Sequence, residues 1–230
     1  MFNRQIRIRV GLGILSAVLA TSMLSAGELS SYRGFTFGMK LSDAARQAGM
    51  NPSEAIVVHR HPALIQELDW RPRSLMLTNP PKADPVEDGR LYFYNEELFR
   101  IVVTYDRYKV EGMTAEDMIE AISLTYGAAT RPATEIGYHS NYAETAEVLA
   151  RWEDQEYSYN LVQTGNRSSF AMVLYSKRAD VLAQAASVEA VQLEAQEAPQ
   201  REIEKQKKRV DDERSILDKA RSANKPNFRP

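Results

Sequence analysis

The spacing of apolar residues predicts two short amphipathic helices, one ending near Gly49 and one ending at Gly127. In both segments apolar residues recur at i, i+3, i+4 and i+7, which places them on one face of a helix. These residues are Leu41, Ala44, Ala45 and Ala48 in the first segment and Ala115, Met118, Ile119 and Ile122 in the second. Each segment opens with Gly-Met, at Gly38 and Gly112, and carries aspartate five residues after that glycine, at Asp43 and Asp117.

The ends of the two predicted helices differ in how well they are capped. Thr114 is a good N-cap, and Asp117 stands at N3, where a carboxylate favours the helix N-terminus. Lys40 occupies the place of Thr114 in the first segment, so we expect that helix to be capped less well. Gly49 and Gly127 suit the C′ position, which favours positive φ.

Each predicted helix is followed by segments rich in Tyr, Val, Leu and Phe, which favour strands. We expect strands at 74–78, 90–94 and 98–105 after the first helix, and at 148–153, 156–163 and 169–176 after the second. Residues 95–97, 154–155 and 164–167 are expected to form turns, and 79–89, with three prolines, an exposed loop. The pattern of 51–73 assigns no structure to that segment.

These elements predict an α+β fold made of two tandem helix-plus-three-strand units, at 27–108 and 109–177. The simplest packing lays both helices on one face of an antiparallel sheet and leaves the other face open.

Residues 178–223 change character, because Ala, Glu, Gln, Lys and Arg dominate and favour a helix. Pro199 should kink this charged tail into about 180–197 and 200–222. Ile203, Val210 and Leu217 are spaced seven apart, as are Val181, Val188 and Ala195. The complementary heptad positions are mostly polar, so a solvated helix is favoured over a coiled coil, and self-association through 180–222 is the alternative. Residues 224–230 are expected to be disordered.

The first 26 residues have the order typical of a secretory signal peptide. Arg4, Arg7 and Arg9 precede an apolar run at 10–24, and small residues follow at Ser25 and Ala26. We expect cleavage after Ala26, with Ser22 as a second choice. The apolar run is nearer 15 residues than the roughly 20 that a spanning helix needs, so a retained anchor is the less favoured interpretation. A periplasmic or secreted location follows, in a bacterial host.

The composition of the chain excludes several classes of site and function. The chain has no cysteine, which excludes disulfides, cysteine nucleophiles and a lipid-modified cysteine. The net charge is −2 for the whole chain, and the first 26 residues contribute +3, so the remainder carries −5. This mildly acidic balance argues against nucleic-acid binding.

A Gly-Met helix followed by three strands, occurring twice, resembles the β-lactamase-inhibitor-protein-like fold. It is also similar to the single unit of outer-membrane assembly lipoproteins of the SmpA/BamE type. The resemblance covers about residues 32–176 and rests on Gly38-Met39, Gly112-Met113, Asp43 and Asp117. It implies a protein binder rather than an enzyme. The chain lacks the disulfides of the first group and the lipidated cysteine of the second, so neither target protein is carried over.

Catalytic and metal signals are weak. His59 and His61 are the closest histidine pair, and His139 is distant; a metal site or a hydrolase centred on these three is the least favoured hypothesis. The acidic clusters near 96–97 and 153–156 fall in predicted turns, where charges are solvated. No catalytic residue, metal ligand or cofactor is assigned.

Tyrosines form the candidate binding surface, which comprises Tyr92, Tyr94, Tyr157 and Tyr159. Because side chains alternate along a strand, Leu91 and Phe93 are expected inside, with Tyr92 and Tyr94 near solvent or a partner. Trp70 and Trp152 are expected to be core residues.

These observations favour an exported, non-enzymatic protein-binding or scaffolding module that uses an open sheet face, with an unidentified protein partner. A structural protein that oligomerises through its C-terminal helix is the alternative.

Overall fold

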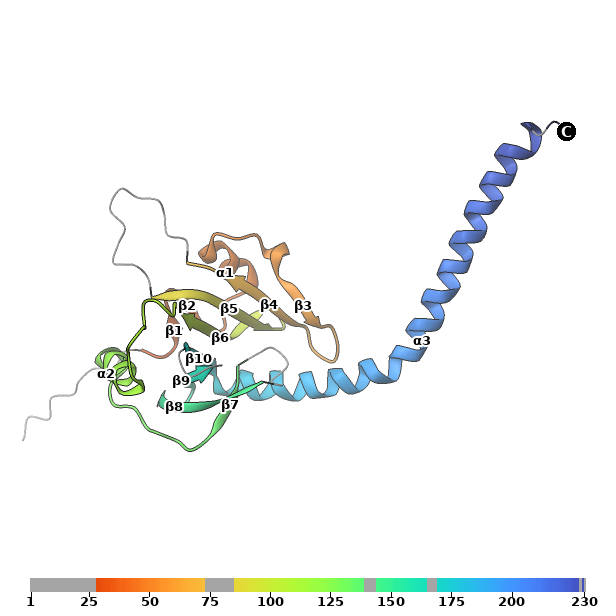
Figure 1. Ribbon diagram of the computed structural model, residues 1–230. Helices are drawn as coiled ribbons and strands as arrows, with labels where there is room; N and C mark the ends of the chain where they lie inside the picture. The colour runs from red at the N-terminus through yellow and green to blue at the C-terminus, as the bar shows by residue number, and fades with distance from the viewer. Residues whose placement is uncertain (1–27, 73–84, 139–143, 165–168, 228, 230) are drawn as a thin grey trace, which may run out of the picture.

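The computed structural model describes residues 28–72, 85–138, 144–164, 169–227 and 229. The predicted signal peptide, the strand expected at 74–78, most of the 79–89 loop, residues 165–167 of the predicted turn and His139 therefore lie outside the described residues. The described part is α+β, as predicted, with a large antiparallel sheet and a long C-terminal helix (Figure 1).

Eight of the described strands form one sheet in which every neighbouring pair is antiparallel. In spatial order they are β3 (Ile56–His59), β4 (Ile65–Trp70), β5 (Val86–Tyr94), β6 (Glu97–Tyr105), β10 (Ser169–Ser176), β9 (Tyr157–Thr164), β8 (Thr145–Glu153) and β7 (Glu135–Gly137). The two halves of the chain thus share a sheet, joined where β6 pairs with β10.

The predicted helix-plus-three-strand unit is not confirmed. Each short helix is followed by four described strands. The sequence pattern did not predict β3 and β4, which lie in the segment 51–73, or β7, which has only 3 residues. Strand β5 also begins at Val86, so the end of the predicted 79–89 loop belongs to the sheet.

The two short helices are α1 (Leu41–Ala48) and α2 (Ala115–Tyr126), close to their predicted positions. Thr114 caps α2 in a capping box with Asp117, whose pKa is held below its usual range by hydrogen bonds from the Thr114 backbone and side chain. Lys40 provides no side-chain cap to α1. Gly49 and Gly127 both have positive φ, as expected of helix-terminating glycines.

The first Gly-Met motif also attaches α1 to the sheet. Gly38 N–H donates to the Leu98 carbonyl at 2.7 Å, and Leu98 N–H donates to the Met39 carbonyl at 2.8 Å. Gly38 has φ +85°, a conformation that favours glycine. The start of β6 therefore fixes where α1 begins.

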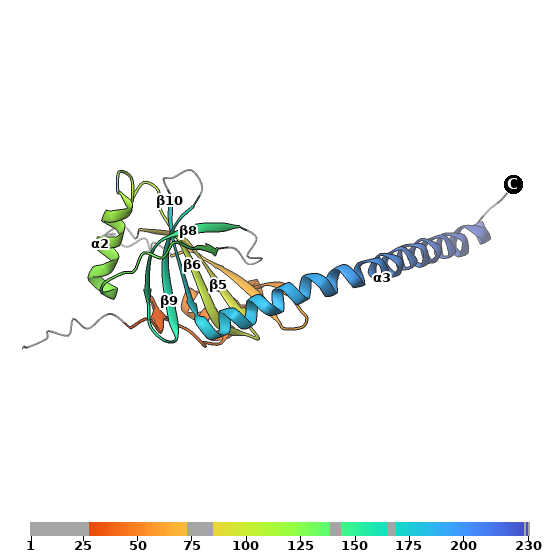
Figure 2. The same ribbon diagram turned by 90° about the horizontal axis from the view of Figure 1, so that it is seen from below.

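One face of the sheet packs against α1, α2 and the ribbon formed by β1 (Ser31–Tyr32) and β2 (Phe35–Thr36), and the other packs against α3 (Lys177–Asn224). Figure 2 shows α2 and α3 on opposite sides of the strands. The prediction of an open face is wrong where α3 lies, because the first part of that helix covers it.

Helix α3 is continuous through Pro199 and changes direction along its length (Figure 1). Proline lacks the N–H that would bond the carbonyl four residues earlier, so a bend without a break is its usual effect. The segment expected to be disordered contains a 3-10 turn, η2 (Lys225–Asn227), directly after α3; another such turn, η1 (Pro52–Glu54), precedes β3.

Both tryptophans lie in the core beneath α1 and α2, as predicted, with Trp70 at 8% and Trp152 at 2% exposure. Trp70 packs edge-on against Phe35 and directly over Gly89 of β5. A Cβ at Gly89 would stand 2.5 Å from the Trp70 ring, so this glycine makes room for the indole.

We predict that Gly89→Ala lowers the free energy of unfolding by about 1–3 kcal/mol, the usual cost of overpacking a core. Chemical denaturation followed by tryptophan fluorescence measures the loss. Glu87→Ala, at an exposed position in the same strand, is the matched control and should change stability by less than about 0.5 kcal/mol. Equal stability of Gly89→Ala and the unsubstituted protein would contradict the packing described.

Candidate functional site

The four tyrosines of the predicted binding surface do not form one surface. Tyr92 and Tyr159 are buried, at 2% and 0% exposure, and the other two are partly buried. Tyr92 and Tyr94 belong to the core cluster under α3, whereas Tyr157 and Tyr159 belong to the cluster under α1 and α2. The expectation that Tyr92 faces solvent is therefore wrong: alternation along β5 was correct, but both sheet faces are covered.

Tyr157 and Tyr159 make structural contacts on the face covered by α1 and α2. The Tyr159 hydroxyl donates to the Ser31 carbonyl at 2.8 Å, and its ring packs edge-on against Tyr126. Tyr157 stacks on Phe37 with ring centroids 5.4 Å apart. Burial raises the pKa of Tyr159 well above its usual value. These contacts complete the core and connect it to the β1–β2 ribbon.

The first part of α3 docks on the sheet through small side chains. Its buried residues are Ala183, Ala186, Ser187 and Ala190, which share one helix face by their spacing of three and four. Small side chains allow the helix backbone to approach the sheet closely, and the Ser187 hydroxyl is satisfied by the Ala183 carbonyl at 2.8 Å. On the sheet, this face meets valines and aromatic rings from both halves of the chain.

A buried ion pair fixes the start of α3. Arg100 of β6 is 2% exposed, and its Nη1 lies 2.7 Å from Oδ1 of Asp180 in the first turn of α3. Its Nη2 donates to the Gly137 carbonyl of β7, and its guanidinium lies 5.6 Å from the ring centroid of Tyr175. One side chain thus connects β6, β7, β10 and α3. A buried cation with these partners is consistent with a structural role.

The two described histidines, His59 and His61, differ in their surroundings. His59 ends β3, is 8% exposed, and its Nδ1 lies 3.1 Å from Oε1 of Glu194. His61 follows the strand instead of sharing a strand face with His59. In the described part of the chain, no three His, Cys, Asp or Glu side chains come close enough to hold a metal ion. The hydrolase hypothesis needs His139, so it stays an untested prediction.

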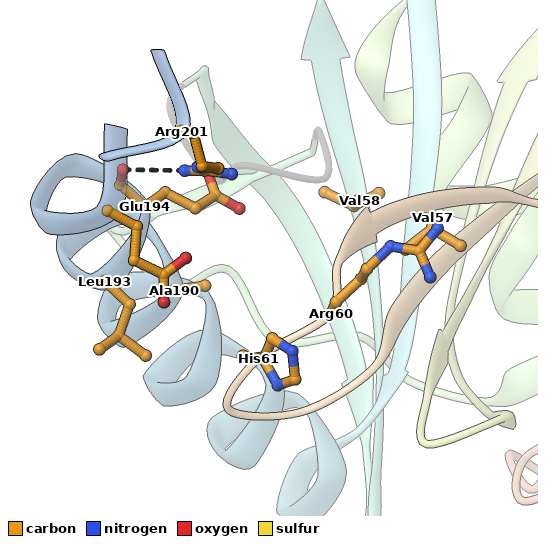
Figure 3. A pocket seen from close by; sticks show the side chains of 9 residues that line it. Val57, Val58, Arg60, His61, Ala190, Leu193, Glu194 and Arg201 are labelled. Carbon is orange, nitrogen blue, oxygen red and sulfur yellow. Dashed lines mark hydrogen bonds between the residues drawn. The ribbon is translucent and has the colours of Figure 1, made fainter. Parts of the chain in front are cut away.

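A pocket of about 370 Å³ lies between the β3–β4 hairpin and α3 (Figure 3). It is lined by Val57, Val58, Arg60, His61, Ala190, Leu193, Glu194, Glu197 and Arg201. Arg201 donates from Nη2 to the Glu194 carbonyl at 2.9 Å, reaching back across Pro199. The pocket therefore marks the place where α3 leaves the domain, and its mixed charges do not select a ligand of one sign.

A second pocket of about 370 Å³ is mostly apolar and lies beside α2. Met113, Met118 and Ile122 line it together with Tyr105 and Tyr126. Arg33 and Lys109 also line it, and its lining residues include no carboxylate and no histidine.

Beyond the first pocket, α3 projects from the domain (Figures 1 and 2). Every described residue from Glu194 to Asn227 is exposed. Aliphatic residues on this distal segment, defined as 200–224, remain largely in water: Ile203 is 67% exposed, Val210 62% and Leu217 69%. Sequence spacing identified these three residues, but only the structure shows that the domain leaves them uncovered.

None of the family models, curated proteins or solved structures compared with this chain matches it. Among the described helices, none has both the length and the apolar character required to cross a bilayer. The described structure thus consists of a domain, a helix held to it by a buried ion pair, and an exposed continuation of that helix.

We predict that Asp180→Ala lowers the free energy of unfolding by about 3 kcal/mol, because it leaves the Arg100 cation buried without its counter-ion. The double variant Arg100→Met/Asp180→Leu should recover much of this loss, since it removes both charges. Urea denaturation gives the values. Glu97→Ala, which breaks the exposed pair with Lys40, is the control and should cost less than about 1 kcal/mol. A loss equally small for Asp180→Ala would contradict the role given to the buried pair.

Stability should also fall at high pH through Tyr92. Burial, and to a smaller extent the nearby Glu67 carboxylate, raises the pKa of Tyr92 from 10.0 to about 12. The unfolded chain therefore loses this proton first, and stability that is complete below pH 10 is lost progressively up to pH 12. At pH 11 the loss from this group is about 1 kcal/mol.

Denaturation curves at pH 8 and pH 11 measure that loss. Tyr92→Phe should reduce the difference between the two pH values, whereas Tyr108→Phe, at a residue that is 71% exposed, should leave it unchanged. An unchanged difference in Tyr92→Phe would show that Tyr92 titrates normally.

Proposed function

We propose that the protein is an exported, non-enzymatic protein-binding or scaffolding module of the bacterial envelope, and that the distal segment of α3 is its contact element. The observation that supports this most is the exposure of Ile203, Val210 and Leu217 on a helix that extends away from a well-packed domain. This helix buries no apolar face against the described part of the chain, so its aliphatic residues are available to another molecule.

The domain then serves as a rigid support. Arg100 and Asp180 hold the first turn of α3, while the small-residue face of the helix packs on strands from both halves of the chain. The direction in which the distal segment leaves the domain is set by these contacts and by the change of direction along α3 (Figure 1). A contact element with a defined exit direction suits a scaffold better than a freely tethered helix does.

The remaining parts of the proposal come from the sequence. The basic, apolar and small-residue order of residues 1–26 supports export, and the absence of any recognisable catalytic motif supports a binding role. The resemblance to β-lactamase-inhibitor-protein-like and SmpA/BamE-type proteins also supports a binding role. The finer part of the proposal is that the two halves of the chain are tandem copies of one unit.

In-cell crosslinking of the tagged protein tests the proposal. We expect discrete crosslinked products in the periplasmic fraction, and we expect Ile203→Ser/Leu217→Ser to abolish them, because it removes exposed aliphatic contacts from the distal segment. Leu124→Ser is the matched control, since Leu124 is an exposed aliphatic residue (86%) on α2. The control should retain the products. Products that persist in the double variant, or no product at all, would overturn the proposal.

A further inference from the structure

Three of the four large exposed aliphatic residues of the distal segment lie along one line, and the fourth, Ile216, is 65% exposed and lies beside that line next to Leu217. Ile203, Val210 and Leu217 are seven residues apart, so successive members are two helical turns apart and drift only about 20° around the axis. Together they form a narrow apolar seam roughly 21 Å long, at 1.5 Å of rise per residue. The described domain makes no use of this seam, because all three side chains are more than 60% exposed.

Charge next to Val210 is divided into two blocks, whereas farther out the signs alternate, with Glu202 and Glu204 on one side and Arg214, Asp218 and Lys219 on the other. The basic block precedes Val210 and consists of Lys205, Lys207, Lys208 and Arg209. The acidic block follows at once and consists of Asp211, Asp212 and Glu213. Val210 is thus both the middle of the apolar seam and the point where the charge changes sign.

Stabilisation within a single helix does not account well for this order. The blocks make three successive i,i+4 pairs, which are Lys207/Asp211, Lys208/Asp212 and Arg209/Glu213. All three run from base to acid, which is the less stabilising direction for such pairs. A partner that presents the opposite order of charge would use the blocks more fully.

We infer that this partner is a second copy of the same chain, packed antiparallel along the distal segment with a two-fold axis at Val210. This inference deepens the proposed function and rests on it. Reversing the direction of the second helix places Ile203 of each copy opposite Leu217 of the other. It also places the basic block of each copy level with the acidic block of the other, so the apolar and the charged complementarity hold together.

The parallel arrangement lacks this complementarity. In register, it would set four cations beside the same four cations and three acids beside the same three acids, which is repulsive over distances shorter than the Debye length. Antiparallel packing also sends the two domains to opposite ends of the pair. From Pro199 of one copy to Pro199 of the other is 22 residues of helix, roughly 33 Å at 1.5 Å per residue.

The cysteine-free chain allows the orientation to be tested by disulfide formation. The variants Ile203→Cys, Val210→Cys and Leu217→Cys are purified singly and oxidised mildly. We expect Val210→Cys to form a disulfide-linked dimer by itself, because it lies on the axis. Ile203→Cys and Leu217→Cys should each give only background dimer alone, since their identical thiols would be roughly 21 Å apart, and should crosslink when mixed.

Charge reversal tests whether the basic block of one copy pairs with the acidic block of the other. Analytical ultracentrifugation measures dimer formation of Asp211→Lys/Asp212→Lys/Glu213→Lys and of Lys205→Glu/Lys207→Glu/Lys208→Glu/Arg209→Glu. Each variant alone should bind itself at least about tenfold more weakly, which equals about 1.4 kcal/mol. Their mixture should form a heterodimer. Lys225→Glu, beyond both blocks, is the control and should dimerise normally, and circular dichroism checks that each variant is folded.

The outcomes separate this inference from the proposed function. Dimerisation of Ile203→Cys with itself would show a parallel pair and overturn the antiparallel arrangement. Monomers at all concentrations and in every mixture would overturn self-pairing. If a different protein were then still captured in cells through Ile203 and Leu217, the binding function would stand with another partner. Loss of both would remove the function and the inference together.

Discussion

The structure depends on the burial of a single cation in the covered second face of the sheet. Arg100 stands on β6, one of the two strands that join the halves of the chain, and its guanidinium reaches Asp180 on α3 and the Gly137 carbonyl on β7. A charge removed from water at this depth requires nearby partners. The helix that supplies one of them is thereby held against the sheet, and the sheet face that would otherwise be open is closed.

The rest of α3 follows from that attachment. Small residues at 183, 186, 187 and 190 let the helix lie close to the strands, and His59 and Glu194 add a contact at the sheet edge. The helix then changes direction as it leaves the sheet (Figure 1). Past this point the chain continues as a helix without any support from its own domain. Helices in water are marginal without tertiary contacts, so a long exposed segment with an apolar seam is well suited to a partner.

The central pair of strands also explains how the two halves of the chain cooperate. Each half supplies one short helix and a run of adjacent antiparallel strands, and β6 and β10 meet in the middle. Cores on both sheet faces therefore draw residues from both halves. The tyrosines of β5 and β9, which were expected to form a binding surface, pack in these shared cores.

Local physics determined much of the fold from the sequence alone. The helices at Leu41 and Ala115, the capping box of Thr114, the terminating glycines and five of the ten described strands depend on neighbours within a few residues, so the sequence pattern predicts them. The seven-residue seam at Ile203, Val210 and Leu217 was readable for the same reason. Which side of a strand meets solvent is not local: Tyr92 is buried because a helix about 90 residues later in the chain packs over it. The Arg100–Asp180 pair joins residues 80 apart in sequence, and no periodicity encodes such a meeting. Only the tertiary structure decided what each face of the sheet packs against, and hence which apolar residues remained for a partner.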